Sequence, residues 1–143
     1  MIYTSYYAKI KKLPEDVIPV SIAGKAPKGF KGIQYKKLAP KYSFFSVWKE
    51  NHDNEYYIKH FNEEVLATLD VKQVISDLES FKKDENSKIA LICYEKSEDF
   101  CHRHLVAYWL KCNGYECEEY KEDIHGWDIR TCQIIKYIQR FLL

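Results

Sequence analysis

Hydrophobic and polar residues follow different periods along the chain, and each period predicts a type of element. Residues 2–7 and 17–22 are short stretches rich in tyrosine and β-branched residues, which favour strands. Residues 88–94 form a continuous apolar run between polar neighbours, which is typical of a strand buried on both faces of a parallel sheet. Residues 115–120 place glutamates between apolar residues and predict a further short strand.

Helical spacing of apolar residues predicts four helices, over residues 53–68, 70–83, 99–112 and 128–142. Asp70 and Asp99 are placed to cap the second and third of them, because aspartate accepts hydrogen bonds from free backbone N–H groups. Asn113 and Gly114 form a stop signal for the third. The alternation of strands and helices predicts an α/β fold. We expect one compact domain over residues 1–143, with a mostly parallel sheet flanked by helices in three Rossmann-like layers.

Residues 23–41 fit neither period and carry most of the glycines and prolines, so they are predicted to form a long ordered loop. Loops of this length are uncommon in compact domains and often functional. The net charge of the whole chain is +1, which argues against a protein that binds polyanions through its overall charge. The charge is unevenly spread, however. Residues 17–49 contain seven lysines and no acidic residue, so they carry +7 and residues 50–143 carry −7.

The lysine–aromatic segment, residues 23–49, interleaves its lysines with aromatic residues: Phe30, Tyr35, Tyr42, Phe44, Phe45 and Trp48. Lysines beside aromatic rings can hold a polyanion, with phosphates on the amines and bases on the rings. The segment is therefore a candidate surface of a non-catalytic nucleic-acid or protein-binding module. The alternative is a solvated lysine face over aromatic residues that belong to the core.

Composition narrows the class and the compartment. Hydrophobic residues make up 46% of the chain and aromatics 15%, which excludes wholesale disorder. No apolar run is long enough to cross a membrane, and the first residues lack the pattern of a secretory signal. The five cysteines include no Cys-x-x-Cys pair, and their odd number favours reduced thiols over a disulfide framework. The sequence thus predicts a cytoplasmic protein without membrane partners.

The candidate chemistry lies where the apolar strand 88–94 passes into the next helix. Cys93 ends the strand and Glu95 follows it, while Cys101, His102 and Arg103 fall at the start of the helix. Ligands bind open α/β sheets where strands end and helices begin, and helix N-termini attract anions. A cysteine there favours the thiolate, and arginine is a natural fork for phosphate or carboxylate.

Other interpretations of these residues remain open. Cys93 and Cys101 are also typical core residues, and the remaining cysteines and His104 have no obvious functional setting. A phosphatase loop is excluded, because its arginine follows the cysteine by six positions and Arg103 follows Cys93 by ten. A zinc site could use Cys93 and Cys101 with His102 or His104. The gap between the two cysteines and the adjacency of Cys101 and His102 argue against it, so no metal is predicted.

The motif of these residues resembles a known family. Cys93-Tyr94-Glu95 followed by Cys101-His102-Arg103 is similar to the hallmark of the bacterial, archaeal and phage family called domain of unknown function 488. Residues 3–7, 20–22, 27–30 and 38–40 also resemble its upstream segments. The resemblance implies a compact α/β domain and assigns no reaction. It points to Cys93, Glu95, Cys101, His102 and Arg103, which the helix-terminus argument also selects.

We therefore expect a small anionic ligand, phosphate-bearing or nucleotide-like, at the strand-to-helix turn. Arg103 would hold the anion, with Ser21, Lys25 and Lys28 completing the pocket if the loop after the second strand lies at the same sheet edge. In a thiol-dependent reaction, Cys101 would be the nucleophile, His102 its base or charge partner, and Glu95 a general base or orienting group. Cys93 would pack behind the site. The sequence leaves open the reaction, any cofactor, the oligomeric state and whether the protein is an enzyme.

Overall fold

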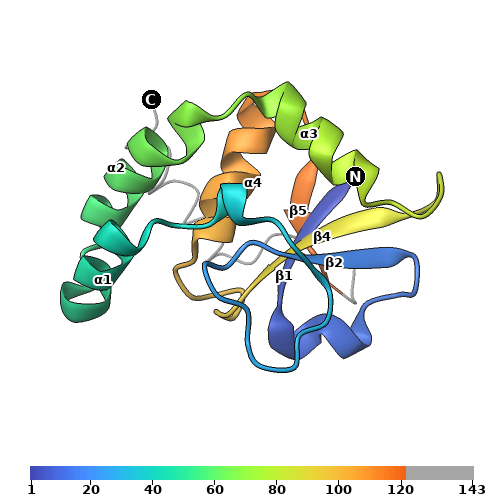
Figure 1. Cartoon of the computed structure of the whole chain (residues 1–143), viewed down its shortest axis with the longest axis horizontal. Coiled ribbons are helices and arrows are strands. Elements are labelled where there is room, and N and C mark those ends of the chain that lie inside the picture. Colours follow the sequence, from blue (N-terminus) through green and yellow to red (C-terminus); the bar gives the residue numbers. More distant parts are fainter. Residues whose placement is uncertain (122–143) are drawn as a thin grey trace.

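A computed structural model describes residues 1–121 of the chain, and five parallel strands form its sheet (Figure 1). The strand order is β3-β2-β4-β1-β5. β4 pairs with both β1 and β2, and every pairing is parallel. The strand bounds are β1 Ile2–Tyr6, β2 Val17–Ser21, β3 Ile33–Gln34, β4 Lys88–Cys93 and β5 Cys117–Glu119. The predicted α/β class and parallel sheet are confirmed.

Helices flank this sheet. The α-helices are α1 Tyr42–Asn51, α2 Asn54–Glu64, α3 Val71–Ser80 and α4 His102–Cys112, and they gather on one side in Figure 1. There are also three short 3-10 helices: η1 Tyr7–Lys12 between β1 and β2, η2 Lys36–Leu38 between β3 and α1, and η3 Leu66–Thr68 between α2 and α3. The segment 7–13, which contains η1, packs its apolar side chains on the opposite face of the sheet. The sheet is thus covered on both faces.

β4 is the centre of the core. Ile89 and Leu91 belong to the large cluster that packs against the α-helices, while Ala90 and Ile92 belong to the cluster under η1. All four side chains are at most 1% exposed. Alternate residues of an apolar strand therefore fill two cores, which confirms the prediction of a strand buried on both faces.

Several element boundaries differ from the sequence prediction. α1 was not predicted, because its lysines, serines and aromatic residues continue the pattern of the segment before it. The predicted loop 23–41 contains β3 and η2. Asp70 caps α3 as predicted, accepting a hydrogen bond from the Lys72 amide. Cys101 rather than Asp99 is the N-cap of α4, because the turn after β4 extends two residues further than expected.

The stop signal after α4 is confirmed. Gly114 follows the helix with φ of 88°, a left-handed conformation that glycine adopts without strain. The helix predicted over residues 128–142 and the cysteine at position 132 lie outside the described residues. Within residues 1–121, no helix has the length and apolarity needed to cross a membrane.

Candidate functional site

The candidate site lies at the carboxyl edge of the sheet. β4 ends at Cys93 and β2 ends at Ser21, and the parallel pairing brings these ends to the same edge. The turn 94–101 then returns the chain to the start of α4. Side chains that are distant in sequence therefore meet where an open α/β sheet usually binds its ligand.

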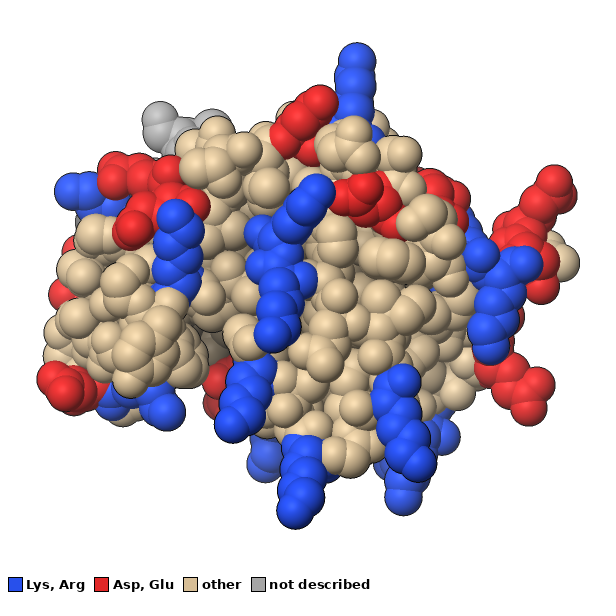
Figure 2. Space-filling model, in the orientation of Figure 1, with Lys and Arg blue, Asp and Glu red and all other residues tan. Residues whose placement is uncertain are grey.

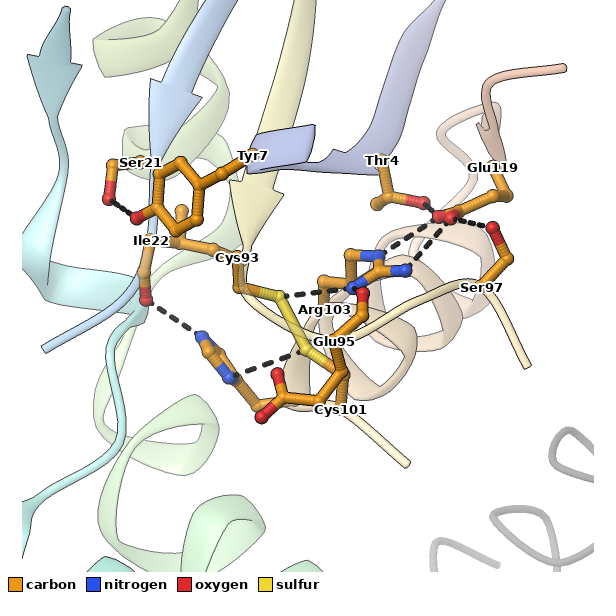
Figure 3. The surroundings of a disulfide bond; sticks show 11 residues. Thr4, Tyr7, Ser21, Ile22, Cys93, Glu95, Ser97, Cys101, Arg103 and Glu119 are labelled. Carbon is orange, nitrogen blue, oxygen red and sulfur yellow. Dashed lines mark hydrogen bonds and ion pairs between the residues drawn. A yellow bond between two sulfur atoms is a disulfide. The ribbon is translucent and has the colours of Figure 1, made fainter. Parts of the chain in front are cut away.

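The sulfurs of Cys93 and Cys101 are joined as a disulfide (Figure 3). Both residues are buried, at 1% and 4% exposure, and their Cα atoms are 7.6 Å apart. The expectation of reduced thiols is therefore wrong for this pair in the present structure, because the turn folds Cys101 back over the end of β4. Cys112 and Cys117 are free, the first exposed and the second buried in β5.

His102 is fixed between the backbone and the sulfurs. Its Nε2 donates a hydrogen bond to the Ile22 carbonyl oxygen at 2.7 Å, which leaves Nδ1 unprotonated and 3.9 Å from the Cys101 sulfur. Burial lowers the pKa of His102 to about 4, so the ring is neutral at pH 7. A neutral imidazole thus directs a lone pair toward Cys101.

Arg103 lies behind the sulfurs with its side chain completely buried. Its Nε and Nη2 donate to the two carboxylate oxygens of Glu119 at 3.0 and 2.9 Å. Nη1 donates to the Glu95 carbonyl oxygen at 2.6 Å and lies 3.4 Å from the Cys93 sulfur (Figure 3). These donors face protein groups, and Arg103 is not among the residues that line the cavity described below.

Glu119 is the residue of this centre that sequence reasoning missed. Its side chain is 6% exposed and also accepts hydrogen bonds from the hydroxyls of Thr4 and Ser97, at 2.6 and 2.8 Å. Burial alone would raise the pKa of Glu119, but its hydrogen bonds and attraction to Arg103 hold that pKa below the ordinary value. The only sequence signal was a glutamate on a short strand, and nothing local identifies Arg103 as its partner.

A cavity of about 710 Å³ opens beside the sulfurs. Two predicted features meet in its wall, because the cysteine–histidine motif and the lysine–aromatic segment both contribute to it. From the motif come Cys93, Glu95, Cys101 and His102. From the segment come Ala23, Gly24, Lys25, Pro40, Tyr42, Phe45, Trp48 and Lys49, and Tyr57, Tyr94 and Phe100 complete the wall.

The loop after β2 is held against this edge. The Tyr94 hydroxyl donates to the Lys25 carbonyl oxygen at 2.6 Å, and the Tyr94 ring packs edge-on against Tyr7. The loop therefore lies at the same sheet edge as Cys101, as a joined pocket requires. Of Ser21, Lys25 and Lys28, which were expected to complete the pocket, Lys25 lines the cavity. Ser21 is buried in a 2.5 Å hydrogen bond with the Tyr7 hydroxyl, and neither it nor Lys28 is among the lining residues.

Glu95 is the one acidic residue among those that line the cavity. Its backbone carbonyl accepts a hydrogen bond from Arg103 (Figure 3), and the residue lines the cavity. Burial raises the pKa of the Glu95 carboxyl, and the nearby Arg103 charge opposes part of that effect. A carboxyl in such a setting is suited to exchanging a proton with a bound ligand.

Three atoms that could coordinate a metal ion lie close together at the floor of the cavity. One donor atom each from Cys93, Cys101 and His102 lies within 4.8 Å of the others, and all three residues are buried. The turn 94–101 brings the two cysteines together although seven residues separate them, and His102 places a ring nitrogen 3.9 Å from the Cys101 sulfur although the two residues are adjacent. His104, the other histidine considered, is not part of this group.

Comparison with known proteins identifies a family but no individual relative. The family model DUF488-N3a, described as the active DUF488-N3 subclade, matches residues 2–114. No curated protein and no solved structure matches the chain. The matched range contains the whole cavity and the cysteine–histidine motif, and it ends before β5.

Proposed function

The chain belongs to the DUF488 family, and from that premise we propose that its cavity binds a nucleotide-like ligand, meaning an aromatic ring system that carries negative charge. The supporting observation is the composition of the wall: aromatic rings and two lysines surround a floor of sulfur and imidazole groups. Its volume of about 710 Å³ falls in the range of roughly 300–1,000 Å³ that small-molecule sites occupy.

The aromatic side of the cavity offers stacking surfaces for a base. Phe45 and Trp48 are stacked with ring centres 6.3 Å apart, and Phe100 lies 5.8 Å from Trp48. The indole is held in place by a 2.8 Å hydrogen bond from its Nε1 to the Asn54 side chain. Tyr42 adds a ring that is 79% exposed at the cavity. Exposed or fixed rings of this kind favour planar ligands.

The positive charge at the cavity comes from Lys25 and Lys49. The charge of Arg103 is balanced by Glu119, so we assign the anion-holding role to the two lysines in place of Arg103. Figure 2 shows lysine side chains projecting along the lower edge of the molecule, where Figure 1 places both the loop between β2 and β3 and η1, which carries Lys9, Lys11 and Lys12.

Calorimetric titration of the full chain tests the proposal with three probes: a nucleoside monophosphate, the matching nucleoside and inorganic phosphate. We expect the monophosphate to bind most tightly, because only it engages the rings and the lysines together. Equal affinity for monophosphate and inorganic phosphate, or no binding of any nucleoside monophosphate, would contradict the proposal.

Replacing Tyr42 by alanine is expected to weaken binding of the monophosphate about tenfold, since stacking on one ring contributes about 1–3 kcal/mol. The ring is exposed, so the unfolding temperature should stay unchanged. Tyr56→Ala is the control for loss of a ring outside the cavity wall; because Tyr56 on α2 packs partly against the core, both variants are compared at a temperature at which each is folded. If the two variants bind equally well, stacking on Tyr42 is excluded.

A thiol-dependent reaction at Cys101 is the second candidate function, favoured by the His102 Nδ1 that faces its sulfur. After reduction, Cys101 should react with iodoacetamide faster than Cys112, as its thiolate displaces iodide and its proton passes to solvent through His102. The two cysteines occupy opposite ends of α4, and the helix dipole favours a thiolate only at the Cys101 end. Slower alkylation of buried Cys101 than of exposed Cys112 would remove this candidate.

A further inference from the structure

The group formed by Cys93, Cys101 and His102 has a composition that a disulfide alone does not explain. Two sulfurs and one imidazole nitrogen lie within 4.8 Å of one another at the floor of a cavity. A structural disulfide needs no imidazole aimed at it, yet the Nδ1 lone pair of His102 faces the Cys101 sulfur. Two thiolates and a neutral imidazole are a common ligand set for zinc.

We propose that, in the thiol form of the protein, Cys93, Cys101 and His102 bind one zinc ion, with a fourth coordination position open to the cavity. All three residues line the cavity, so water or a ligand atom can reach that position. Three protein ligands and one open position distinguish catalytic zinc sites from closed structural ones. The inference does not rest on nucleotide binding.

The surroundings of the three residues support a metal. Metal-bound histidines usually donate their second ring nitrogen to a carbonyl or carboxylate, and His102 donates Nε2 to the Ile22 carbonyl at 2.7 Å. On the other side, Arg103 Nη1 lies 3.4 Å from the Cys93 sulfur, where it can stabilise a thiolate ligand. Since Glu119 balances Arg103, two thiolates and Zn²⁺ leave the centre without net charge.

The backbone spacing of the cysteines also suits a bridging ion. Their Cα atoms are 7.6 Å apart, beyond the usual range of about 4.4–6.8 Å for disulfides. Two sulfurs at about 2.3 Å from one tetrahedral zinc lie about 3.8 Å from each other, a separation that fits within the 4.8 Å spanned by the three donor atoms. The two states of this floor would then be an oxidised pair without metal and a reduced pair with metal.

The conversion between these states balances without redox change at the metal. A phosphine reductant and one water supply two electrons and two protons, the Cys93–Cys101 bond becomes two thiols, and the reductant leaves as the phosphine oxide with the oxygen of the water. Zinc then binds the two sulfurs, and the two thiol protons pass to solvent. Oxidised protein should therefore have no site for the ion.

The test is zinc affinity of the full chain, measured against a competing chelator without nucleotide, before and after treatment with a phosphine reductant. We expect one zinc per reduced chain and at least 100-fold weaker binding by oxidised protein. Cys93→Ser, Cys101→Ser and His102→Gln should each lower the affinity of reduced protein at least 100-fold. Cys112→Ser, at the exposed end of α4, should bind as the wild type does.

Cobalt substitution gives a second readout, because cobalt bound by thiolates shows a thiolate-to-cobalt absorption band. Cobalt bound by surface carboxylates lacks this band. Reduced wild type should show thiolate-to-cobalt absorption, and the Cys101→Ser variant should weaken it. If a variant fails to fold, the zinc affinities of oxidised and reduced wild type still test the proposal. Equal zinc affinity in those two states, or undiminished affinity in a folded Cys93→Ser/Cys101→Ser double variant, would overturn the proposal.

Discussion

Replacing Glu119 with glutamine is expected to lower the free energy of unfolding by about 3–5 kcal/mol, because removing one partner of a buried ion pair leaves the other charge uncompensated. Arg103 is completely buried, and the Glu119 side chain is 6% exposed. The carboxylate also accepts hydrogen bonds from the Thr4 and Ser97 hydroxyls. The change therefore disturbs a hydrogen-bond network that connects β1, β5 and α4.

Urea denaturation of the wild type and the variant measures this effect. Glu118→Gln is the matched control, since it makes the same chemical change on the neighbouring residue of β5, which is exposed. The control should lose less than about 0.5 kcal/mol, as surface substitutions usually do. A loss below about 1 kcal/mol for Glu119→Gln would show that Arg103 does not depend on this carboxylate.

The same pair predicts a pH dependence. The pKa of Glu119 is lowered on folding from its ordinary value of 4.5, because attraction and hydrogen bonds to Arg103, with a smaller effect of His104, outweigh burial. A carboxyl whose pKa falls on folding stabilises the folded state fully above its ordinary pKa. That contribution disappears as pH falls through the lowered pKa. The stability difference between wild type and Glu119→Gln should therefore stay constant from pH 7 to about pH 5 and shrink in stronger acid. A difference that grows in acid would contradict this.

Replacing both Lys25 and Lys49 with methionine is expected to weaken binding of a nucleoside monophosphate about 100-fold. Hydrogen bonds to charged groups contribute about 1.5–3 kcal/mol each, and the two lysines supply the positive charge among the residues that line the cavity floor and mouth. Neither residue belongs to the buried core, so the fold should survive the change.

The matched control is Lys28→Met/Lys31→Met, which removes the same charge from the same lysine–aromatic segment at positions outside the cavity wall. Calorimetry should show at most a few-fold loss for this control. If the two double variants lose affinity equally, the segment acts through its general field, as a nucleic-acid-binding module would. The role assigned to the cavity would then be wrong.

Much of the fold follows from local pattern. The segment that forms β4 is apolar because both faces of the strand are buried. An apolar run of this kind can be recognised from the sequence alone. Asp70 could be placed as an N-cap because capping involves only neighbouring residues. α1 could not be predicted, since its helix forms where Phe44 packs against Tyr57 and Phe61 of α2.

Within the candidate site, too, the features that depend on local sequence could be predicted and those that depend on tertiary contacts could not. Cys93, Glu95, Cys101 and His102 could be placed at one sheet edge, because a strand-to-helix turn is local in sequence. The pairing of Arg103 with Glu119 could not be predicted, because Glu119 lies on a strand that pairs with β1. That Cys101 and Trp48 line the same cavity could not be predicted either. It depends on α1 packing beside the turn 94–101, a contact between segments about fifty residues apart.

Mapping amide chemical shifts of the isotope-labelled full chain during titration with a nucleoside monophosphate shows where the ligand binds. We expect the perturbed amides to concentrate at Gly24, Lys25, Trp48 and Cys101, around the cavity. Amides near the separate hollow formed by Gly114, Tyr115 and Glu118 should remain unchanged. Perturbations confined to residues 28–37, or spread over that second hollow, would contradict this expectation.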